Sequence, residues 1–128
     1  MKILILGAGQ VGSSAANHLS REEAHEDTVV DMRPEVLREL QDRLDIRTVV
    51  GHAAYPEVLE RAGANDADII VALTNPDETN MVACQVAYTL YHSPTQSARI
   101  RAAEYMSAKK RFMQDAIPGA VRRCPDQL

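Results

Sequence analysis

The residues of this chain that carry the most chemical information lie at its beginning, where three glycines follow an apolar run. Gly7, Gly9 and Gly12 form the pattern GxGxxG directly after residues 3–6, which read Ile-Leu-Ile-Leu. At this spacing the glycines allow a tight turn, a close approach of bare backbone to a pyrophosphate, and close packing of a helix on a strand. The first turn of the following helix, residues 10–14, has no acidic residue, so its amides are free to bind an anion. We therefore expect a phosphate site in this loop.

An acidic residue in the second predicted strand completes the pattern of a nucleotide site. Such an acid is expected about 20 residues beyond the glycines, where it accepts hydrogen bonds from the ribose hydroxyls. Asp31 follows the apolar residues Val29 and Val30 slightly later than that spacing. A carboxylate there favours a free 2′-hydroxyl, and hence NAD or an adenosine nucleotide over NADP, although Arg33 weakens this discrimination because arginine pairs with phosphate. Asp31 also suits a helix cap before Pro34, a role compatible with ribose binding.

Composition limits the classes of protein to which the chain can belong. Its 128 residues are enough for one domain with a core of its own. A net charge of −4, without a basic stripe or an aromatic stacking platform, argues against nucleic acid as a partner. No apolar run approaches the roughly 20 residues that a membrane span needs, so direct membrane insertion is not expected. Cys84 and Cys124 are expected to be reduced thiols, and neither they nor the four histidines show the spacing of a metal site.

Short apolar runs alternate with helical patterns along the chain, which is typical of a parallel sheet covered on both faces. The pattern predicts an α/β, doubly wound, single domain. Strands are expected near residues 2–6, 27–31, 46–50, 69–73 and 98–101, and helices near 10–20, 34–44, 56–62, 76–91 and 104–114. A sixth strand is left open, because Arg122 and Arg123 place two charges where an apolar strand would run.

The fourth predicted helix has the start signals of a capped helix. Asn75 is the expected N-cap residue, Pro76 takes the first helical position, and Glu78 follows three residues after the cap. With acidic residues in this first turn, the helix N-terminus is already compensated, and a second phosphate is not expected there.

In an open parallel sheet a ligand lies beyond the carboxyl ends of the strands. Small residues after the third strand suit a flat adenine ring, and an arginine at the end of the fifth could neutralise pyrophosphate or be a solvated surface residue. The residues expected along this edge are Gly51, His52, Ala53, Thr74, Asn75 and Arg101, with Asp126 added if a sixth strand forms.

Several runs of this sequence resemble one protein family specifically. They are Val50–Pro56, Ala64–Asp68, Thr74–Ala87 and Ala98–Arg101. Together they resemble the N-terminal nucleotide-binding domain of TrkA-type potassium-uptake regulators, also called a KTN or RCK domain, which has a Rossmann-like fold. The resemblance covers residues 1–118. Residues 119–128 are expected to be a degraded last strand or tail, and we expect the C-terminal regulatory lobe of the relatives to be absent.

The resemblance implies a function and a set of site residues. It implies a cytoplasmic, peripheral subunit, a homodimer or homotetramer, that assembles on a membrane potassium transporter and controls its ion flux. The domain would bind NAD(H), or ATP and ADP, without transforming them. By position, Gly7, Gly9, Gln10, Val11 and Gly12 match the phosphate loop, Asp31 the ribose ligand, Gly51, His52 and Ala53 the adenine side, and Arg101 the basic residue facing phosphate.

Two alternatives and one further surface remain from the residues alone. The chain could be the cofactor-binding half of an NAD-dependent dehydrogenase, an interpretation that composition does not exclude. Tyr105 and Lys109 have the Tyr-xxx-Lys spacing of short-chain dehydrogenases, but those enzymes use a different glycine pattern and about twice this length. A stripe on the fourth helix is expected either to form a subunit interface or to pack in the core: Met81, Cys84, Gln85, Tyr88 and Tyr91.

Overall fold

The structure is a computed structural model that describes residues 1–22, 24–102 and 120–124, the last of these as backbone only. The predicted helix at 104–114, the Tyr105 and Lys109 pair, and Asp126 lie outside the described residues.

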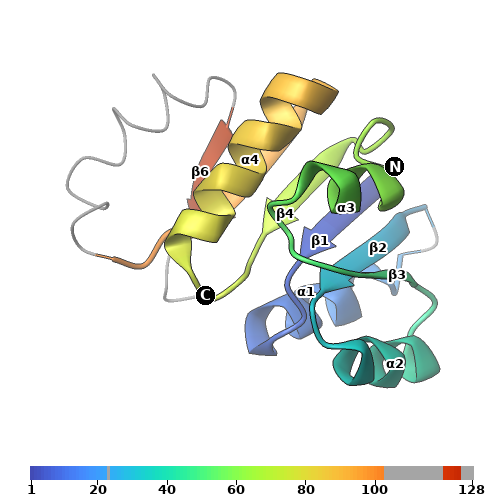
Figure 1. The fold of residues 1–128 in the computed structure, drawn as a ribbon. Helices are drawn as coiled ribbons and strands as arrows, with labels where there is room; N and C mark the ends of the chain where they lie inside the picture. The colour runs from blue at the N-terminus through green and yellow to red at the C-terminus, as the bar shows by residue number, and fades with distance from the viewer. Residues whose placement is uncertain (23, 103–119, 125–128) are drawn as a thin grey trace.

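Six parallel strands form one sheet in the order β3-β2-β1-β4-β5-β6, which confirms the predicted doubly wound α/β fold (Figure 1). The strands are β1 (Lys2–Leu6), β2 (Glu26–Asp31), β3 (Arg47–Val50), β4 (Ile69–Ala72), β5 (Thr95–Arg99) and β6 (Ala120–Cys124). The described helices are α1 (Gln10–Leu19), α2 (Pro34–Arg43), α3 (Pro56–Arg61) and α4 (Asp77–Tyr91). Apart from β5, each bound lies within about one residue of the prediction.

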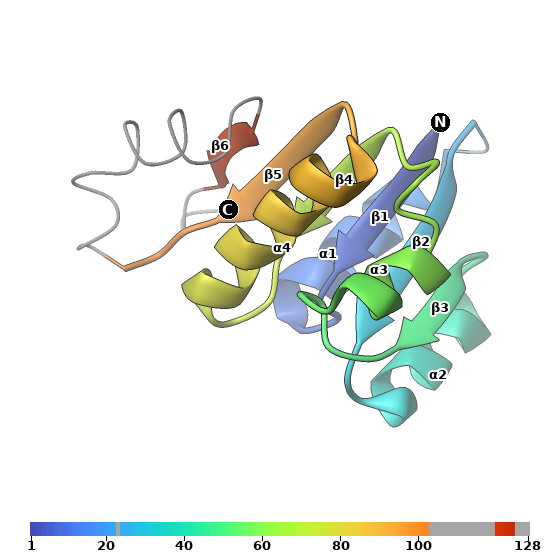
Figure 2. The same cartoon turned by 45° about the horizontal axis from the view of Figure 1, so that its top comes forward.

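The sheet is covered on both faces, and the alternation of side chains along β1 shows why. Ile3 and Ile5 pack with residues of α1 and α2, whereas Leu4 and Leu6 pack with residues of α3 and α4. Figure 2 shows α3 and α4 on the near face of the sheet and α1 behind it. Because both faces are buried, the central strands are continuously apolar rather than alternating, as parallel strands usually are.

The last strands bring one correction and one answer to a question that the sequence left open. β5 begins at Thr95, three residues before the expected start, because the polar residues Gln96 and Ser97 lie in the strand; Gln96 is fully buried and its side-chain amide bonds to Ser93. The backbone also forms a sixth strand despite the two arginines, with a register irregularity against β5 between Ser97 and Arg99. Backbone hydrogen bonding to β5 holds this strand in place whatever the polarity of its side chains.

The order of the strands determines where a ligand site can form. The chain runs outward from β1 to β3 on one side and from β4 to β6 on the other, so the order reverses between β1 and β4. The loops that leave the carboxyl ends of neighbouring strands diverge at such a point and leave a crevice between them. Among the described residues, no helix has the length and apolar character needed to cross a membrane.

Candidate functional site

The glycine loop between β1 and α1 has a geometry that side chains would prevent. Gly7 has a φ of +108°, and a Cβ there would lie 2.9 Å from the backbone of Leu73. A Cβ on Gly12 would lie 1.8 Å from the carbonyl oxygen of Gly7. The first glycine therefore makes the turn and the third brings the helix against the strand, which confirms those two structural roles.

Gly9 differs from its two neighbours, because nothing in the protein requires its lack of a side chain. A Cβ built on Gly9 meets no atom within 4 Å, and its φ of −74° suits any residue. Gly9 is the N-cap of α1, where no side chain caps the amides and no acid lies in the first turn. The N-terminus of α1 is thus open and electrostatically uncompensated, and the space above Gly9 is free for a group from outside.

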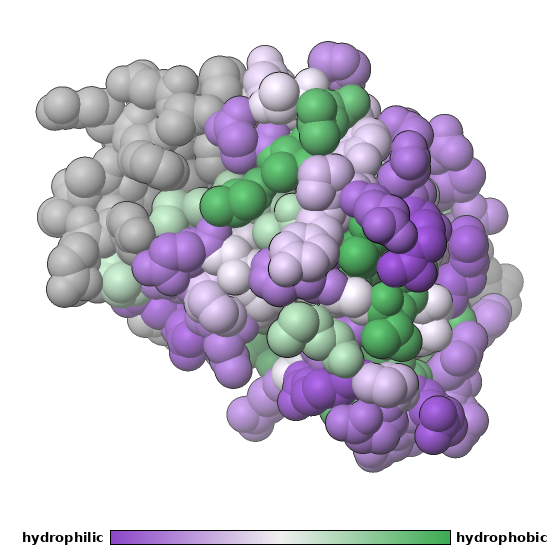
Figure 3. Space-filling view, viewed as in Figure 1, coloured by the Kyte–Doolittle hydropathy of each residue, from purple (hydrophilic) through white to green (hydrophobic). Residues whose placement is uncertain are grey.

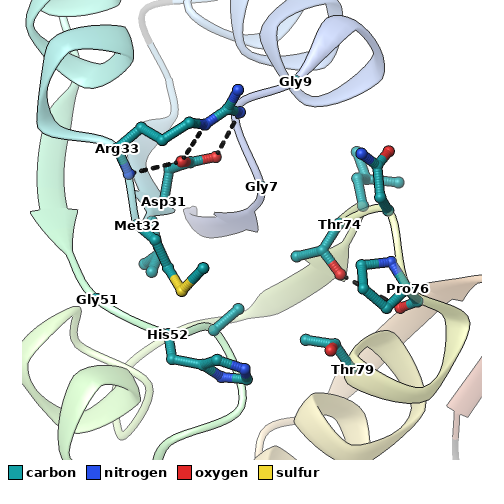
Figure 4. Close-up of a pocket in the computed structure, with 14 residues that line it drawn as sticks. Gly7, Gly9, Asp31, Met32, Arg33, Gly51, His52, Thr74, Pro76 and Thr79 are labelled. Carbon is teal, nitrogen blue, oxygen red and sulfur yellow. Dashed lines mark hydrogen bonds and ion pairs between the residues drawn. The ribbon is translucent and has the colours of Figure 1, made fainter.

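A cleft of about 230 Å³ opens beside this loop, just below the range of about 300–1,000 Å³ usual for ligand pockets and open to solvent on one side. Loops from the ends of β1, β2, β3 and β4 surround it (Figure 4). The predicted site residues that line it are Gly7, Gly9, Asp31, Arg33, Gly51, His52, Ala53, Thr74 and Asn75. The structure therefore brings residues of four separate predicted segments together around one cleft.

Asp31 lies at the end of β2, and its carboxylate contacts the backbone of the glycine loop at Ala8. Its Oδ2 accepts a hydrogen bond from the backbone N–H of Ala8 (2.8 Å), and its Oδ1 accepts one from the backbone N–H of Arg33 (2.9 Å). The Arg33 guanidinium bonds both oxygens, through Nε to Oδ1 (3.0 Å) and Nη2 to Oδ2 (3.2 Å). Burial raises the pKa of Asp31, but the hydrogen bonds from Arg33 and Ala8 outweigh it and hold that pKa below its ordinary value. The group is therefore ionised at neutral pH.

The third segment, after β3, presents an aromatic wall. The His52 ring stacks on Tyr55 with centroids 4.4 Å apart and an interplanar angle of 18°. Its Nδ1 accepts a hydrogen bond from the backbone N–H of Ala54 (3.1 Å), which leaves Nε2 as the donor in the neutral ring. Gly51 lines the cleft, but packing already requires it, since a Cβ there would lie 2.6 Å from a methyl carbon of Val58.

The first turn of α4 carries the two predicted acids, Asp77 and Glu78, but it is not capped as the sequence predicted. The helix begins at Asp77 with Pro76 as N-cap and no side-chain cap, so Asn75 is not the capping residue. A proline that precedes the helix holds extended backbone, and this moves the first turn one residue along. The buried Asp77 carboxylate instead accepts the backbone N–H groups of Arg101 (2.9 Å) and Ala102 (2.6 Å).

Four predicted site residues do not line the cleft: Gln10, Val11, Gly12 and Arg101. The first three lie in the first turn of α1, where their backbone rather than their side chains would face a ligand. The Arg101 guanidinium is turned to the loop before α4, where Nη2 donates to the carbonyl oxygen of Asn75 (2.6 Å). In this arrangement Arg101 supports the loop that lines the cleft.

Comparison with known proteins assigns the chain to a family. Residues 3–117 match the TrkA-N domain family. The chain belongs to the TrkA-N domain family. It is 55% identical over 128 residues to the Trk system potassium uptake protein TrkA of Halomonas elongata, covering all of this chain but 28% of that protein. The TrkA-N domain thus spans less than a third of that relative, and the resemblance in the sequence is confirmed.

Solved structures show the same fold. A Shewanella denitrificans Kef C-terminal domain in AMP-bound form aligns with a TM-score of 0.73 and 22% identity, over 96% of this chain and 72% of that one. The GsuK channel bound to NAD aligns with a TM-score of 0.69 and 19% identity, over 93% of this chain and 20% of that one. At these identities the likeness extends to the fold of the TrkA-N domain.

Sequence reasoning missed five residues that line the cleft of this TrkA-N domain: Val30, Met32, Leu73, Pro76 and Thr79. Each is a neighbour of a predicted residue, so a wider window at each strand end would have included most of them. It also missed Asn80, a buried side chain that bonds Thr74 and the carbonyl oxygen of Arg99. The sequence carries no local signal for this role, because one of the two bonded segments, at Arg99, lies 19 residues away.

The predicted stripe on α4 divides between core and surface. Met81 and Cys84 are buried in the core, and burial raises the pKa of the Cys84 thiol to about 12. Tyr88 is 38% exposed, and Tyr91 donates its hydroxyl to the carbonyl oxygen of Pro56 (2.7 Å). Apolar side chains run along the outer face of α4 in Figure 3, where Val82 and Leu90 are half exposed.

Proposed function

We propose that this TrkA-N domain binds an adenosine nucleotide, NAD(H) or ATP and ADP, in the cleft at the carboxyl edge of the sheet. The relatives of this chain are longer proteins, and we propose that nucleotide binding in such a protein controls a membrane potassium transporter. We also propose that the nucleotide is not transformed. The domain would work on the cytoplasmic side of the membrane, as a homodimer or homotetramer attached through the transporter.

One observation carries the binding proposal: the uncapped N-terminus of α1 lies on one side of the cleft, and the ionised carboxylate of Asp31 lies on the other. The amides of α1 have no capping side chain, and the space at Gly9 is free. Asp31 lies at the end of the neighbouring strand β2 and lines the same cleft. Phosphates suit the first position and ribose hydroxyls the second, which is how dinucleotides lie across doubly wound sheets.

Two further observations support the choice of ligand. His52 lines the cleft on the side expected to receive adenine, and its stacking on Tyr55, which lies outside the cleft lining, supports the orientation of the flat ring. Two solved structures with this fold, the Kef C-terminal domain and the GsuK channel, hold AMP and NAD respectively. Both ligands share an adenosine monophosphate, so this is the part of the ligand that the proposal commits to.

The binding test uses isothermal titration of the chain with NADH, NAD, ATP and ADP. We expect saturable binding of at least one ligand. Gly9→Ala should weaken it tenfold or more while the melting temperature stays unchanged, because the added methyl enters only the space that phosphate would use. Ser14→Ala, at an exposed position on the same helix, is the control. If none of the four ligands binds to folded protein, the proposal fails.

The regulatory and non-catalytic parts need separate measurements. Gly9→Ala introduced into the full-length protein in its own cells should change potassium uptake, followed with a rubidium tracer, while the protein level stays the same. NADH incubated with the chain and a panel of aldehydes and ketones should keep its absorbance. Oxidation of NADH would favour the dehydrogenase interpretation, and unaltered uptake would remove the role in potassium transport.

A further inference from the structure

The ribose-binding oxygens of Asp31 are already in use. A carboxylate has about four lone-pair positions for hydrogen bonds. In this structure four donors fill them: the backbone N–H groups of Ala8 and Arg33, and Nε and Nη2 of the Arg33 guanidinium. Figure 4 shows the guanidinium lying along the carboxylate at the margin of the cleft. A ribose that binds Asp31 through its two hydroxyls therefore has to replace some of these donors.

The four donors differ in how easily they can be replaced. The two backbone amides belong to the glycine loop and to the turn after β2, and the fold holds them in position. The guanidinium is at the end of a flexible side chain that is 53% exposed, whereas the Asp31 side chain is 9% exposed. The exposed guanidinium can bind water in place of the carboxylate, so its displacement costs less than the displacement of an amide that the backbone fixes. Arg33 is therefore the donor that a ribose would displace.

We propose that Arg33 competes with the nucleotide ribose for Asp31. Arg33 thereby determines how strongly the site prefers a 2′-hydroxyl over a 2′-phosphate on the sugar. This inference rests on the proposed nucleotide binding and adds a specificity-determining residue to it. A ligand with a free 2′-hydroxyl binds Asp31 only after the guanidinium has moved. A ligand with a 2′-phosphate meets the guanidinium itself, which pairs with phosphate in a two-pronged geometry.

The position of Arg33 after displacement supports this double role. Its backbone N–H stays bonded to Asp31 Oδ1, so the side chain remains attached at the margin of the cleft beside the ribose position. Among the described residues that line the cleft, Arg33 is the one with a permanent positive charge. A site with Asp31 alone would repel a 2′-phosphate, and the arginine offsets that repulsion.

The size of the effect follows from the weakness of the pair that must be broken. Ion pairs with an exposed member contribute a few tenths of a kcal/mol to about 1 kcal/mol. This corresponds to about a twofold to fivefold change in affinity. Because the Arg33 guanidinium is exposed to solvent, salt weakens its pairing with Asp31, and the effect should shrink as ionic strength rises.

The experiment compares AMP with adenosine 2′,5′-bisphosphate, titrated into the chain and two variants. Arg33→Met removes the guanidinium and keeps the length of the side chain. Arg38→Met, at an exposed position on α2, makes the same change of charge away from the cleft. Arg33→Met should bind AMP about two to five times more tightly than Arg38→Met does. It should bind the bisphosphate more weakly, and both differences should be smaller in high salt.

A third variant separates competition from charge. Arg33→Lys keeps the charge but loses the planar fork that engages both oxygens of Asp31. Competition predicts that Arg33→Lys also binds AMP more tightly than the unsubstituted chain. An unchanged ratio of the two affinities in Arg33→Met, relative to Arg38→Met, would overturn the inference. Failure of the folded, unsubstituted chain to bind AMP at all would instead remove the proposed function, and this inference with it.

Discussion

Two helices begin at the carboxyl edge of the sheet, and their first turns are treated in opposite ways. At α1 the chain provides a glycine N-cap, no acid and no side-chain cap. At α4 it provides Asp77 and Glu78 in the first turn and the buried Asn80 in the second, with Asp77 and Asn80 bonded to neighbouring backbone. Neither helix has a side-chain cap, and both follow central strands of the same sheet. We call the acid-free N-terminus of α1 the open end, and the N-terminus of α4, with its two acids and its buried polar side chains, the closed end.

This difference separates binding from stability within one fold. Polar side chains at the closed end bind backbone groups of β5 and the loop before α4, so they hold two parts of the chain together. The open end leaves donors without protein partners and places them beside the cleft. Substitutions at the closed end should therefore lower stability, and substitutions at the open end should chiefly lower affinity.

The largest expected effect is the exception to that division, Gly12→Ala. Gly12 lies at the open end, but the methyl group of an alanine there would lie 1.8 Å from the Gly7 carbonyl oxygen and force α1 away from β1. We expect a loss of more than about 3 kcal/mol in the free energy of unfolding, measured by urea denaturation, because backbone has to move. Gly9→Ala in the same loop should unfold like the parent protein. Equal stability of the two variants would contradict the close packing.

Asn80→Ala should have the next largest effect, because it removes the side chain that joins the closed end to neighbouring segments. The Asn80 side chain makes four hydrogen bonds: Oδ1 accepts from Thr74 N–H (2.9 Å) and Oγ1 (2.6 Å), and Nδ2 donates to the carbonyls of Thr74 and Arg99 (both 2.9 Å). Its loss leaves buried groups unpaired, which costs about 2–4 kcal/mol of unfolding free energy. Val82→Ala, at a half-exposed position on the same helix, is the control. A loss of less than about 1 kcal/mol would mean that water replaces the amide.

The open end could be predicted from sequence, and the closed end only in part. Gly7, Gly9 and Gly12 have a spacing with local consequences, so their turn and helix could be inferred without knowing the rest of the fold. Asp31 could be placed because a parallel strand order brings the ends of β1 and β2 together. These features depend on short segments and on one topological rule.

The missed features depend on contacts between segments far apart in sequence. Asn75 was expected to cap α4 and does not, and the bonds of Asp77 to Arg101 and Ala102, 24 and 25 residues later, were not expected. Gln96 was not expected in a strand because its polarity argues against burial, yet Ser93 satisfies its amide. Long-range hydrogen bonds of this kind leave no periodic signal, so neither the true start of β5 nor the role of Asn80 could be predicted.

Asp31→Asn should have a smaller effect on stability, with a pH dependence of known sign. The pKa of Asp31 is lowered in the folded protein, so its ionised form adds stability that is complete above its unfolded pKa of about 3.9 and is lost as pH falls below that. The variant should be less stable by about 1 kcal/mol at pH 7 and pH 5. The difference should shrink as the pH falls from about 3.9 through the lowered pKa of Asp31 in the folded protein. Asp42→Asn, at an exposed position on α2, should show no such trend in urea denaturation.

The smallest expected change in stability comes from Gln10→Glu, which gives the open helix end the acid that the closed one has. A carboxylate in the first turn of α1 would interact favourably with the helix dipole and raise the free energy of unfolding by about 0.3–1 kcal/mol. The same charge would repel a phosphate at those amides, with a loss of affinity for ADP of about fivefold or more. Gln10→Ala controls for loss of the amide and should change affinity less. Stability and affinity should thus move in opposite directions in one variant, and a rise in both would show that phosphate does not bind at α1.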